Sequence, residues 1–181
     1  MALGNPVYLA IADDATMRRV TAEGVPGTSM AAFAQHSGDM LTDGQIGVIV
    51  AGMRSRWARP DALRDAEPPR YASQAPGDPQ RGVTVFGLYC ASCHGADGRG
   101  GKGASSIVDG SYLALVSDQG LRTTVIAGRP DLGSPDWRGD VPGKPMPPQD
   151  ISDVVAWLAA HRSQFPGQPY SSALQSGGGF P

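Results

Sequence analysis

The stretch Cys90-Ala91-Ser92-Cys93-His94 decides how this chain folds. The 181-residue sequence holds two cysteines and three histidines, and both cysteines and one histidine fall within these five positions. A Cys-x-x-Cys-His pentad is the attachment signature of a c-type haem. The two thiols can anchor the porphyrin edge, while the adjacent imidazole reaches the iron from one side. We therefore expect one covalent haem c held by Cys90, Cys93 and His94, with His94 as the proximal ligand.

Two other chemistries use paired cysteines, and neither fits the surrounding sequence. A tight Cys-x-x-Cys disulfide is typical of thioredoxin-like βαβ units, and no such pattern surrounds residues 90–94. A structural zinc site needs four ligands, and the sequence offers no second Cys/His pair. The glycine-rich run 98–103 is no phosphate loop either, because it lacks the Gly-Lys-[Ser/Thr] ending and the flanking strand.

Helical signals follow the pentad. A short helix is expected to begin at Ser117-Asp118, which can serve as its N-cap, and to run to about Ala127, where Gly128 ends it. A longer helix is expected over about 149–162, because four apolar residues recur at i, i+3, i+4 and i+7. Those four residues are Ile151, Val154, Val155 and Leu158. These signals are those of a helical chain, and the family resemblance given below implies that the whole fold is all-α.

Composition excludes several classes of partner. The net charge of −2 supplies no basic field for nucleic acid and no polybasic patch for a membrane surface. No apolar run approaches the roughly 20 residues of a membrane-spanning helix. The 25 glycines and 16 prolines favour short helices joined by irregular loops.

The sequence around the pentad resembles the class I cytochrome c family. In that family a helix with a glycine and, four residues later, an aromatic precedes the haem site; Gly82 and Phe86 match. A glycine-rich loop such as 95–103 follows the haem site in bacterial members. The family's last helix crosses the first, so the resemblance implies that Trp157 contacts Gly82 and Phe86. Over residues 76–163 it implies a small cytochrome c fold of short helices around a covalent haem.

The resemblance also implies a sixth iron ligand, usually a methionine in the loop before the last helix. Met146, in the Pro-Met-Pro-Pro run at 145–148, is expected to be this ligand. Many relatives instead carry their methionine where this chain has Ser134, and a serine hydroxyl is a poor ligand for haem iron. The alternative is therefore an open sixth site. His161 and His36 are expected to be solvated or structural.

Residues 1–60 repeat the back half of the domain that follows, at an offset of 104 positions. After one residue of slippage the offset is 105, so that Ile46, Val50 and Ala51 match Ile151, Val155 and Ala156. Met30 lies in a segment that resembles the axial-ligand loop of the family, but no upstream helix or pentad precedes it. We interpret 1–60 as half of a second cytochrome c domain. Either its front lies outside this sequence and Met30 served that haem, or the half has degenerated into a structural cover. Matching pairs are Tyr8 with Tyr112, Asp14 with Asp118, Arg18 with Arg122, Gly24 with Gly128 and Pro26 with Pro130.

The start of the chain, Met1 to Ala12, has no basic region followed by an apolar run, so no signal peptide is recognised. Haem c is attached outside the cytoplasm. We therefore expect a periplasmic or otherwise extracytoplasmic protein whose leader is not present in this chain. The expected organisation is a haem-less half-domain (1–60), a Pro-rich linker (61–77), a cytochrome c domain (78–163) and a flexible tail (164–181).

The resemblance implies an electron-transfer protein rather than an enzyme. We expect a carrier, or a cytochrome module of a respiratory chain complex, with redox proteins as donor and acceptor and with possible docking to a membrane complex. A haem enzyme or gas-binding sensor is the alternative, motivated by Ser134. A third hypothesis is a structural subunit whose haem relays electrons inside a fixed assembly.

Overall fold

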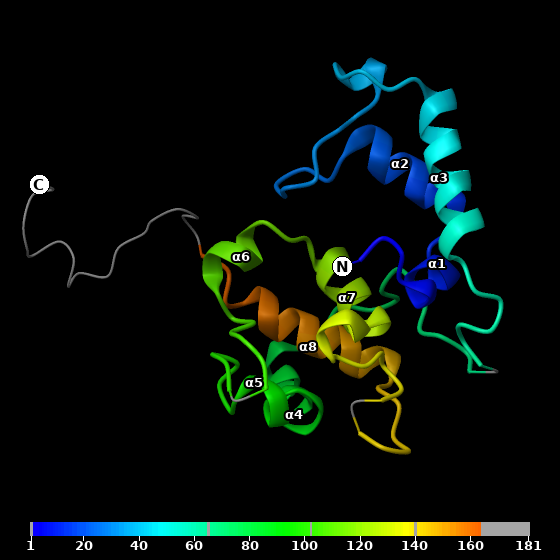
Figure 1. The fold of residues 1–181 in the computed structure, drawn as a ribbon. Helices are drawn as coiled ribbons and strands as arrows, with labels where there is room; N and C mark the ends of the chain where they lie inside the picture. The colour runs from blue at the N-terminus through cyan, green and yellow to red at the C-terminus, as the bar shows by residue number, and fades with distance from the viewer. Residues whose placement is uncertain (1, 65, 102, 140, 164–181) are drawn as a thin grey trace, which may run out of the picture.

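The computed structural model describes residues 2–64, 66–101, 103–139 and 141–163, so the predicted tail at 164–181 lies outside the described residues. The described chain is helical, and its only β pairing consists of isolated bridges (Figure 1). The predicted all-α fold is thus confirmed. The helices are α1 (Pro6–Ile11), α2 (Asp14–Glu23), α3 (Asp43–Trp57), α4 (Pro79–Tyr89), α5 (Ala91–His94), α6 (Gly110–Ala114), α7 (Asp118–Ala127) and α8 (Pro148–Ala159), with 3-10 turns at Gln35–Ser37 and Pro130–Leu132.

The pair α4 and α8 forms the centre of the second half of the chain. Gly82 lies at their crossing, where an added Cβ would clash with the Asp153 carbonyl oxygen and lie 2.6 Å from the Trp157 Cβ. Only glycine permits this close approach. Phe86 stacks on Trp157 with ring centroids 4.3 Å apart. The predicted contact of Trp157 with Gly82 and Phe86 is confirmed.

Local signals set the bounds of α7. The Ser117 hydroxyl accepts a hydrogen bond from the Gly120 amide at 3.1 Å, which caps the helix at its start. Gly128 ends it with φ = +67°, a conformation that favours glycine. The observed helix, Asp118–Ala127, has the predicted bounds.

The last helix is shorter than predicted at its C-terminal end. α8 runs from Pro148 to Ala159 rather than over about 149–162. The amides of His161 and Arg162 bond to carbonyls three residues back, which tightens the last turn into 3-10 geometry.

The first part of the chain follows the same local plan. Asp13 caps α2 by accepting a hydrogen bond from the Thr16 amide at 2.6 Å, and Gly24 ends the helix with φ = +68°. Figure 1 shows α2 and α3 side by side, away from the α4–α8 pair, with α1 connecting them to α7. Asn5, which is buried, donates its side-chain amide to the Ala127 carbonyl at 2.9 Å and fixes α1 there.

Two arginines hold the segment between the halves against the second half. The Arg122 guanidinium donates to the carbonyls of Arg70 at 3.0 Å and Tyr71 at 3.1 Å. Arg138 donates to the Leu63 carbonyl at 2.6 Å. Burial lowers the pKa of Arg122, and its hydrogen bonds offset part of the cost of desolvation. Within the described residues, no helix is both long enough and apolar enough to cross a bilayer.

Candidate functional site

The pentad lies on a single helical turn at the end of α4. The Cys90 carbonyl accepts hydrogen bonds from the amides of Cys93 at 3.2 Å and His94 at 3.0 Å. This i, i+3 spacing places the two cysteines on neighbouring positions of one helical face. Both are thiols rather than a disulfide; Cys90 is half-buried and Cys93 is exposed. Gly95, with φ = +78°, then turns the chain away from the helix.

The imidazole of His94 has a defined orientation. Its Nδ1 lies 3.0 Å from the Ser105 carbonyl oxygen. A carbonyl oxygen can only accept, so Nδ1 carries the proton of this hydrogen bond. In the neutral ring, the lone pair of Nε2 is then available to a metal ion. Such a second hydrogen bond is the usual way in which proteins orient a metal-binding histidine.

The glycine-rich loop brings Ser105 within reach of His94. Gly98 has φ = +75°, and an added Cβ would lie 2.8 Å from Val108 Cγ1 and 3.2 Å from the Trp157 ring. The Ile107 amide donates to the Gly98 carbonyl at 2.9 Å. The loop therefore folds back onto the aromatic side of the α4–α8 crossing. No sequence signal pointed to Ser105, because its contribution is a backbone oxygen.

The buried carboxylate of Asp153 holds the start of α4, the helix that leads into the pentad. Asp153 is fully buried on α8 and accepts hydrogen bonds from the Asp78 amide at 2.8 Å and from the Gln149 side chain at 2.9 Å. Its other oxygen forms an ion pair with Arg81 at 3.4 Å.

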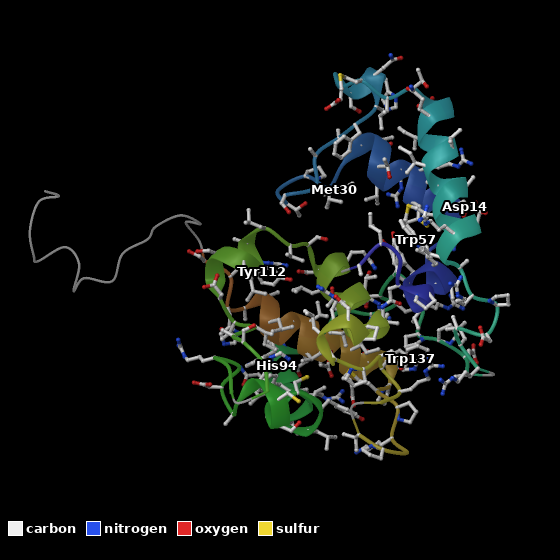
Figure 2. All side chains as sticks on the ribbon, in the orientation of Figure 1. Asp14, Met30, Trp57, His94, Tyr112 and Trp137 are labelled. Atoms are coloured by element: carbon white, nitrogen blue, oxygen red, sulfur yellow. The ribbon has the colours of Figure 1, made fainter. Side chains whose placement is uncertain are left out.

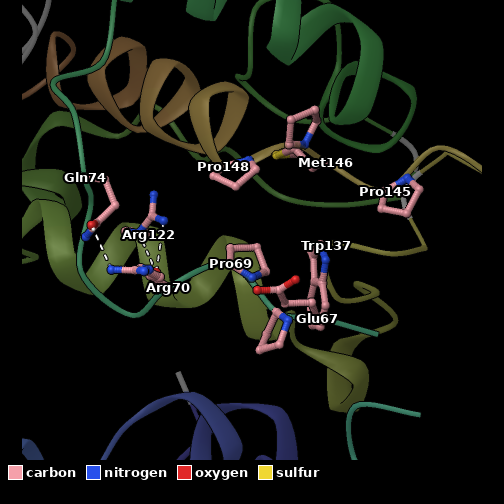
Figure 3. Close-up of a pocket in the computed structure, with 11 residues that line it drawn as sticks. Glu67, Pro69, Arg70, Gln74, Arg122, Trp137, Pro145, Met146 and Pro148 are labelled. Atoms are coloured by element: carbon pink, nitrogen blue, oxygen red, sulfur yellow. Dashed lines mark hydrogen bonds between the residues drawn. The ribbon is translucent and has the colours of Figure 1, made fainter. Parts of the chain in front are cut away.

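Met146 belongs to the same buried core as Phe86 and Tyr89, and Cys90 packs against this core. Its side chain is 2% exposed, and its amide donates to the Trp137 carbonyl at 2.8 Å. It lines a cavity of about 450 Å³ together with Trp137, Arg122 and Pro69 (Figure 3). The residues that line this cavity come from 67–74, 122, 137 and 145–148, and so do not include the pentad.

The other candidate residues lie at the surface. Ser134 closes a small loop through reciprocal backbone hydrogen bonds with Arg129, at 2.9 and 3.0 Å. His161 is exposed and donates from Nδ1 to the Trp157 carbonyl at 2.8 Å. His36 is also exposed, 3.7 Å from Asp43. Figure 2 shows Met30 in the α2–α3 unit and His94 on α5.

The donor set at the pentad fits a covalently attached haem c. Two thiols and an imidazole project from one turn, and the imidazole is held with Nε2 available for iron. Phe86 and Tyr89, in the last turn of α4 before Cys90, are buried and form part of the apolar core beneath the pentad.

Comparison with known proteins identifies this half of the chain. Residues 79–162 match the cytochrome c family. They form a cytochrome c domain. Membership of this family implies a covalently bound haem c. The first helix of the matched region is α4 and the last is α8, so the match covers the crossing, the pentad and the loop that contains Met146.

Two curated relatives carry the same description, cbb3-type cytochrome c oxidase subunit CcoP. The Rhodobacter capsulatus protein is 32% identical over 106 residues, which cover 54% of this chain and 33% of that protein. The Rubrivivax gelatinosus protein is 26% identical over 125 residues, which cover 66% of this chain and 38% of that protein. The chain thus spans about a third of the length of these relatives.

Among solved structures, a chain of the reducing HAO-like protein complex of Kuenenia stuttgartiensis resembles this one with a TM-score of 0.48. The sequence identity is 18%, and the alignment covers 83% of this chain and 73% of that chain.

Proposed function

We propose that the cytochrome c domain carries one haem c and transfers electrons, with Cys90 and Cys93 as its thioether anchors and His94 as the proximal ligand. Haem c, when bound, supplies a one-electron Fe(III)/Fe(II) couple. The observation that carries the proposal is the hydrogen bond from His94 Nδ1 to the Ser105 carbonyl, which leaves Nε2 available for iron on the same helical turn that carries both thiols. The protein's part is to hold these three side chains rigidly on the α4–α8 pair.

We propose that residues 1–60 are the back half of a second cytochrome c domain. In α8, Asp153 and Val154 are 0% and 1% exposed. Their counterparts in α3, Val48 and Ile49, are 72% and 42% exposed. The face that α8 uses to pack on α4 is thus uncovered in α3. A helix like α4, with its own pentad, would cover this face of α3. The sequence contains one pentad, which corresponds to one haem.

We propose that the chain acts outside the cytoplasm as a cytochrome module of a respiratory complex, with redox proteins as donor and acceptor. The description of both relatives as subunits of a cytochrome c oxidase supports this role. The segments 61–77 and 164–181 remain the predicted linker and tail. Met146 as the sixth ligand is what the family resemblance implies, and the comparison of two loops below argues against it.

A second candidate function is that of a haem enzyme or gas-binding sensor with an open sixth iron site. Ser134 favours it, because this residue holds the loop position at which many relatives have a methionine. Electron transfer does not require an open site, whereas binding of an external ligand does. An open sixth site is therefore necessary for the second function and compatible with electron transfer.

The experiment is expression of the chain behind an export signal in a host that matures c-type cytochromes. Mass spectrometry of the purified protein is expected to show one covalent haem, and a redox titration one reversible one-electron wave. Cys90→Ser and Cys93→Ser should each leave at most one thioether, while Ser92→Ala, between them, should match the wild type. A wild-type chain that acquires no covalent haem would contradict the proposal.

A further inference from the structure

We infer that the sixth coordination position of the haem iron is not filled by the protein and accepts a small neutral ligand such as carbon monoxide. The inference rests on the proposed haem site. It follows from comparing two loops of this chain: the loop after α2, which presents Met30, and the loop after α7, which presents Ser134. These loops share two backbone hydrogen bonds, and the shared bonds assign Met146 to a packing position.

The first shared feature fixes the register of Met30 and Ser134. The Val25 amide donates to the Met30 carbonyl at 2.9 Å, and the Arg129 amide donates to the Ser134 carbonyl at 2.9 Å. Each loop begins at a glycine with nearly the same φ, +68° after α2 and +67° after α7. Ser134 therefore stands at the place in the second loop that Met30 holds in the first.

The second shared feature gives the counterpart of Met146. After both loops an aromatic residue anchors the chain: the Phe33 amide donates to Thr21 at 3.1 Å, and the Trp137 amide to Ile126 at 3.2 Å. The carbonyl of each aromatic residue then accepts one further amide. It comes from Leu41 at 2.9 Å in the first half and from Met146 at 2.8 Å in the second.

Met146 is thus the counterpart of a leucine, whose side chain has no atom that could bind iron. Both residues lie directly before the N-cap of the following helix, which is Thr42 for α3 and Pro147 for α8. An apolar side chain at this position suits packing in either half. The soft thioether of Met146 is not needed to explain why a large apolar residue stands there.

The surroundings of Met146 restrict its movement. It is 2% exposed, and Pro145, Pro147 and Pro148 restrict the backbone on both sides because each proline ring fixes φ. α8 begins at Pro148, so little loop remains to carry the sulfur elsewhere.

Ser134 cannot replace a methionine as an iron ligand. Its hydroxyl is a hard, neutral oxygen and lacks the soft sulfur that binds haem iron well. Its backbone is held by the two hydrogen bonds with Arg129, so the short side chain has little freedom to approach the iron. The loop therefore offers no strong ligand at the position where the first half offers a thioether.

The test is carbon monoxide binding to the reduced, haem-loaded full chain, followed by absorption spectroscopy. The wild type and Met146→Leu, which copies Leu41, are expected to bind carbon monoxide with affinities within about threefold of each other. Ser134→Met, which copies Met30, is expected to weaken binding at least tenfold. Met146→Leu conserves volume, so its unfolding midpoint should stay close to that of the wild type.

The outcomes separate the inference from the proposed function. Covalent haem in a wild type that binds no carbon monoxide, with binding gained in Met146→Leu, would identify Met146 as the ligand and overturn the inference alone. Unchanged binding in Ser134→Met would overturn the place assigned to Ser134. A wild type with no covalent haem would overturn both the haem site and the inference.

Discussion

The two halves of the chain build the same elements from the same local signals, but only one of them completes its core. Helices α2 and α7 have corresponding bounds, an N-cap directly before the first residue and a glycine of positive φ directly after the last. Yet α8 packs on α4, whereas the corresponding face of α3 exposes Val48 and Ile49. Caps and glycines thus set where a helix begins and ends, while burial depends on a partner elsewhere in the sequence.

The largest expected difference between the halves is at the aromatic anchors. Trp137 is 3% exposed, and its counterpart Phe33 is 39% exposed. Trp137→Ala is expected to lower the free energy of unfolding by about 3–5 kcal/mol, because it leaves a large cavity in a packed core. Phe33→Ala is expected to cost about 1 kcal/mol or less, because much of that ring already faces water.

Urea unfolding of the haem-loaded chain, followed by circular dichroism, measures both effects. Equal losses for Trp137→Ala and Phe33→Ala would mean that the first half has a completed core of its own. The proposal that residues 1–60 lack their partner helix would then be wrong.

The next difference concerns the helix crossing, which the second half has and the first half does not. Gly82→Ala forces a methyl group against the backbone of Asp153, so we expect a loss of about 1–3 kcal/mol. Gly87→Ala, on the same helix, meets no atom within 4 Å and should stabilise α4 by about 0.5–1 kcal/mol. Gly52→Ala, at the α3 position that corresponds to Trp157, is also unobstructed and should behave like Gly87→Ala.

Thermal unfolding of the three alanine variants, with matched haem content, tests this ordering. A destabilised Gly52→Ala would reveal a partner packed on that face of α3. A neutral Gly82→Ala would show that α4 and α8 can separate without loss.

Sequence reasoning located those features that local patterns determine. The bounds of α7 follow from Ser117 and Gly128, and the crossing followed from the family resemblance of Gly82 and Phe86. Two kinds of feature stayed hidden. The Ser105 carbonyl that orients His94 is a backbone atom, so the identity of residue 105 carries no signal for it.

The second kind of feature that the sequence did not reveal is a polar side chain whose hydrogen-bond partners lie far away in the sequence. Arg122 lies on α7, and an arginine on a short helix is ordinarily exposed. In the structure it is 3% exposed, because the segment near Arg70 and Tyr71 folds over it and supplies acceptors. Position in the repeat could not predict this, since Arg18, its counterpart, is exposed.

The smallest expected difference lies in the chemistry of the two helix caps. The hydrogen bond from the Thr16 amide lowers the pKa of the Asp13 carboxyl below its usual value. A carboxylate with a lowered pKa in the folded state stabilises that state above its unfolded pKa, and this contribution is lost as the pH falls through the folded pKa. Ser117, the corresponding cap of α7, has a neutral hydroxyl that does not titrate. The start of α2 should therefore loosen in acid before the start of α7 does.

Amide hydrogen exchange can resolve this difference, because each cap bonds to one amide, that of Thr16 or that of Gly120. On acidification below the usual carboxyl pKa, protection at Thr16 is expected to fall while protection at Gly120 holds. Asp13→Asn keeps an oxygen acceptor but removes the charge, so it should abolish the pH dependence at Thr16. If both amides lose protection together in Asp13→Asn as well as in the wild type, the transition is a general acid unfolding. The starts of α2 and α7 would then respond to pH in the same way, although one cap is a carboxylate and the other is a hydroxyl.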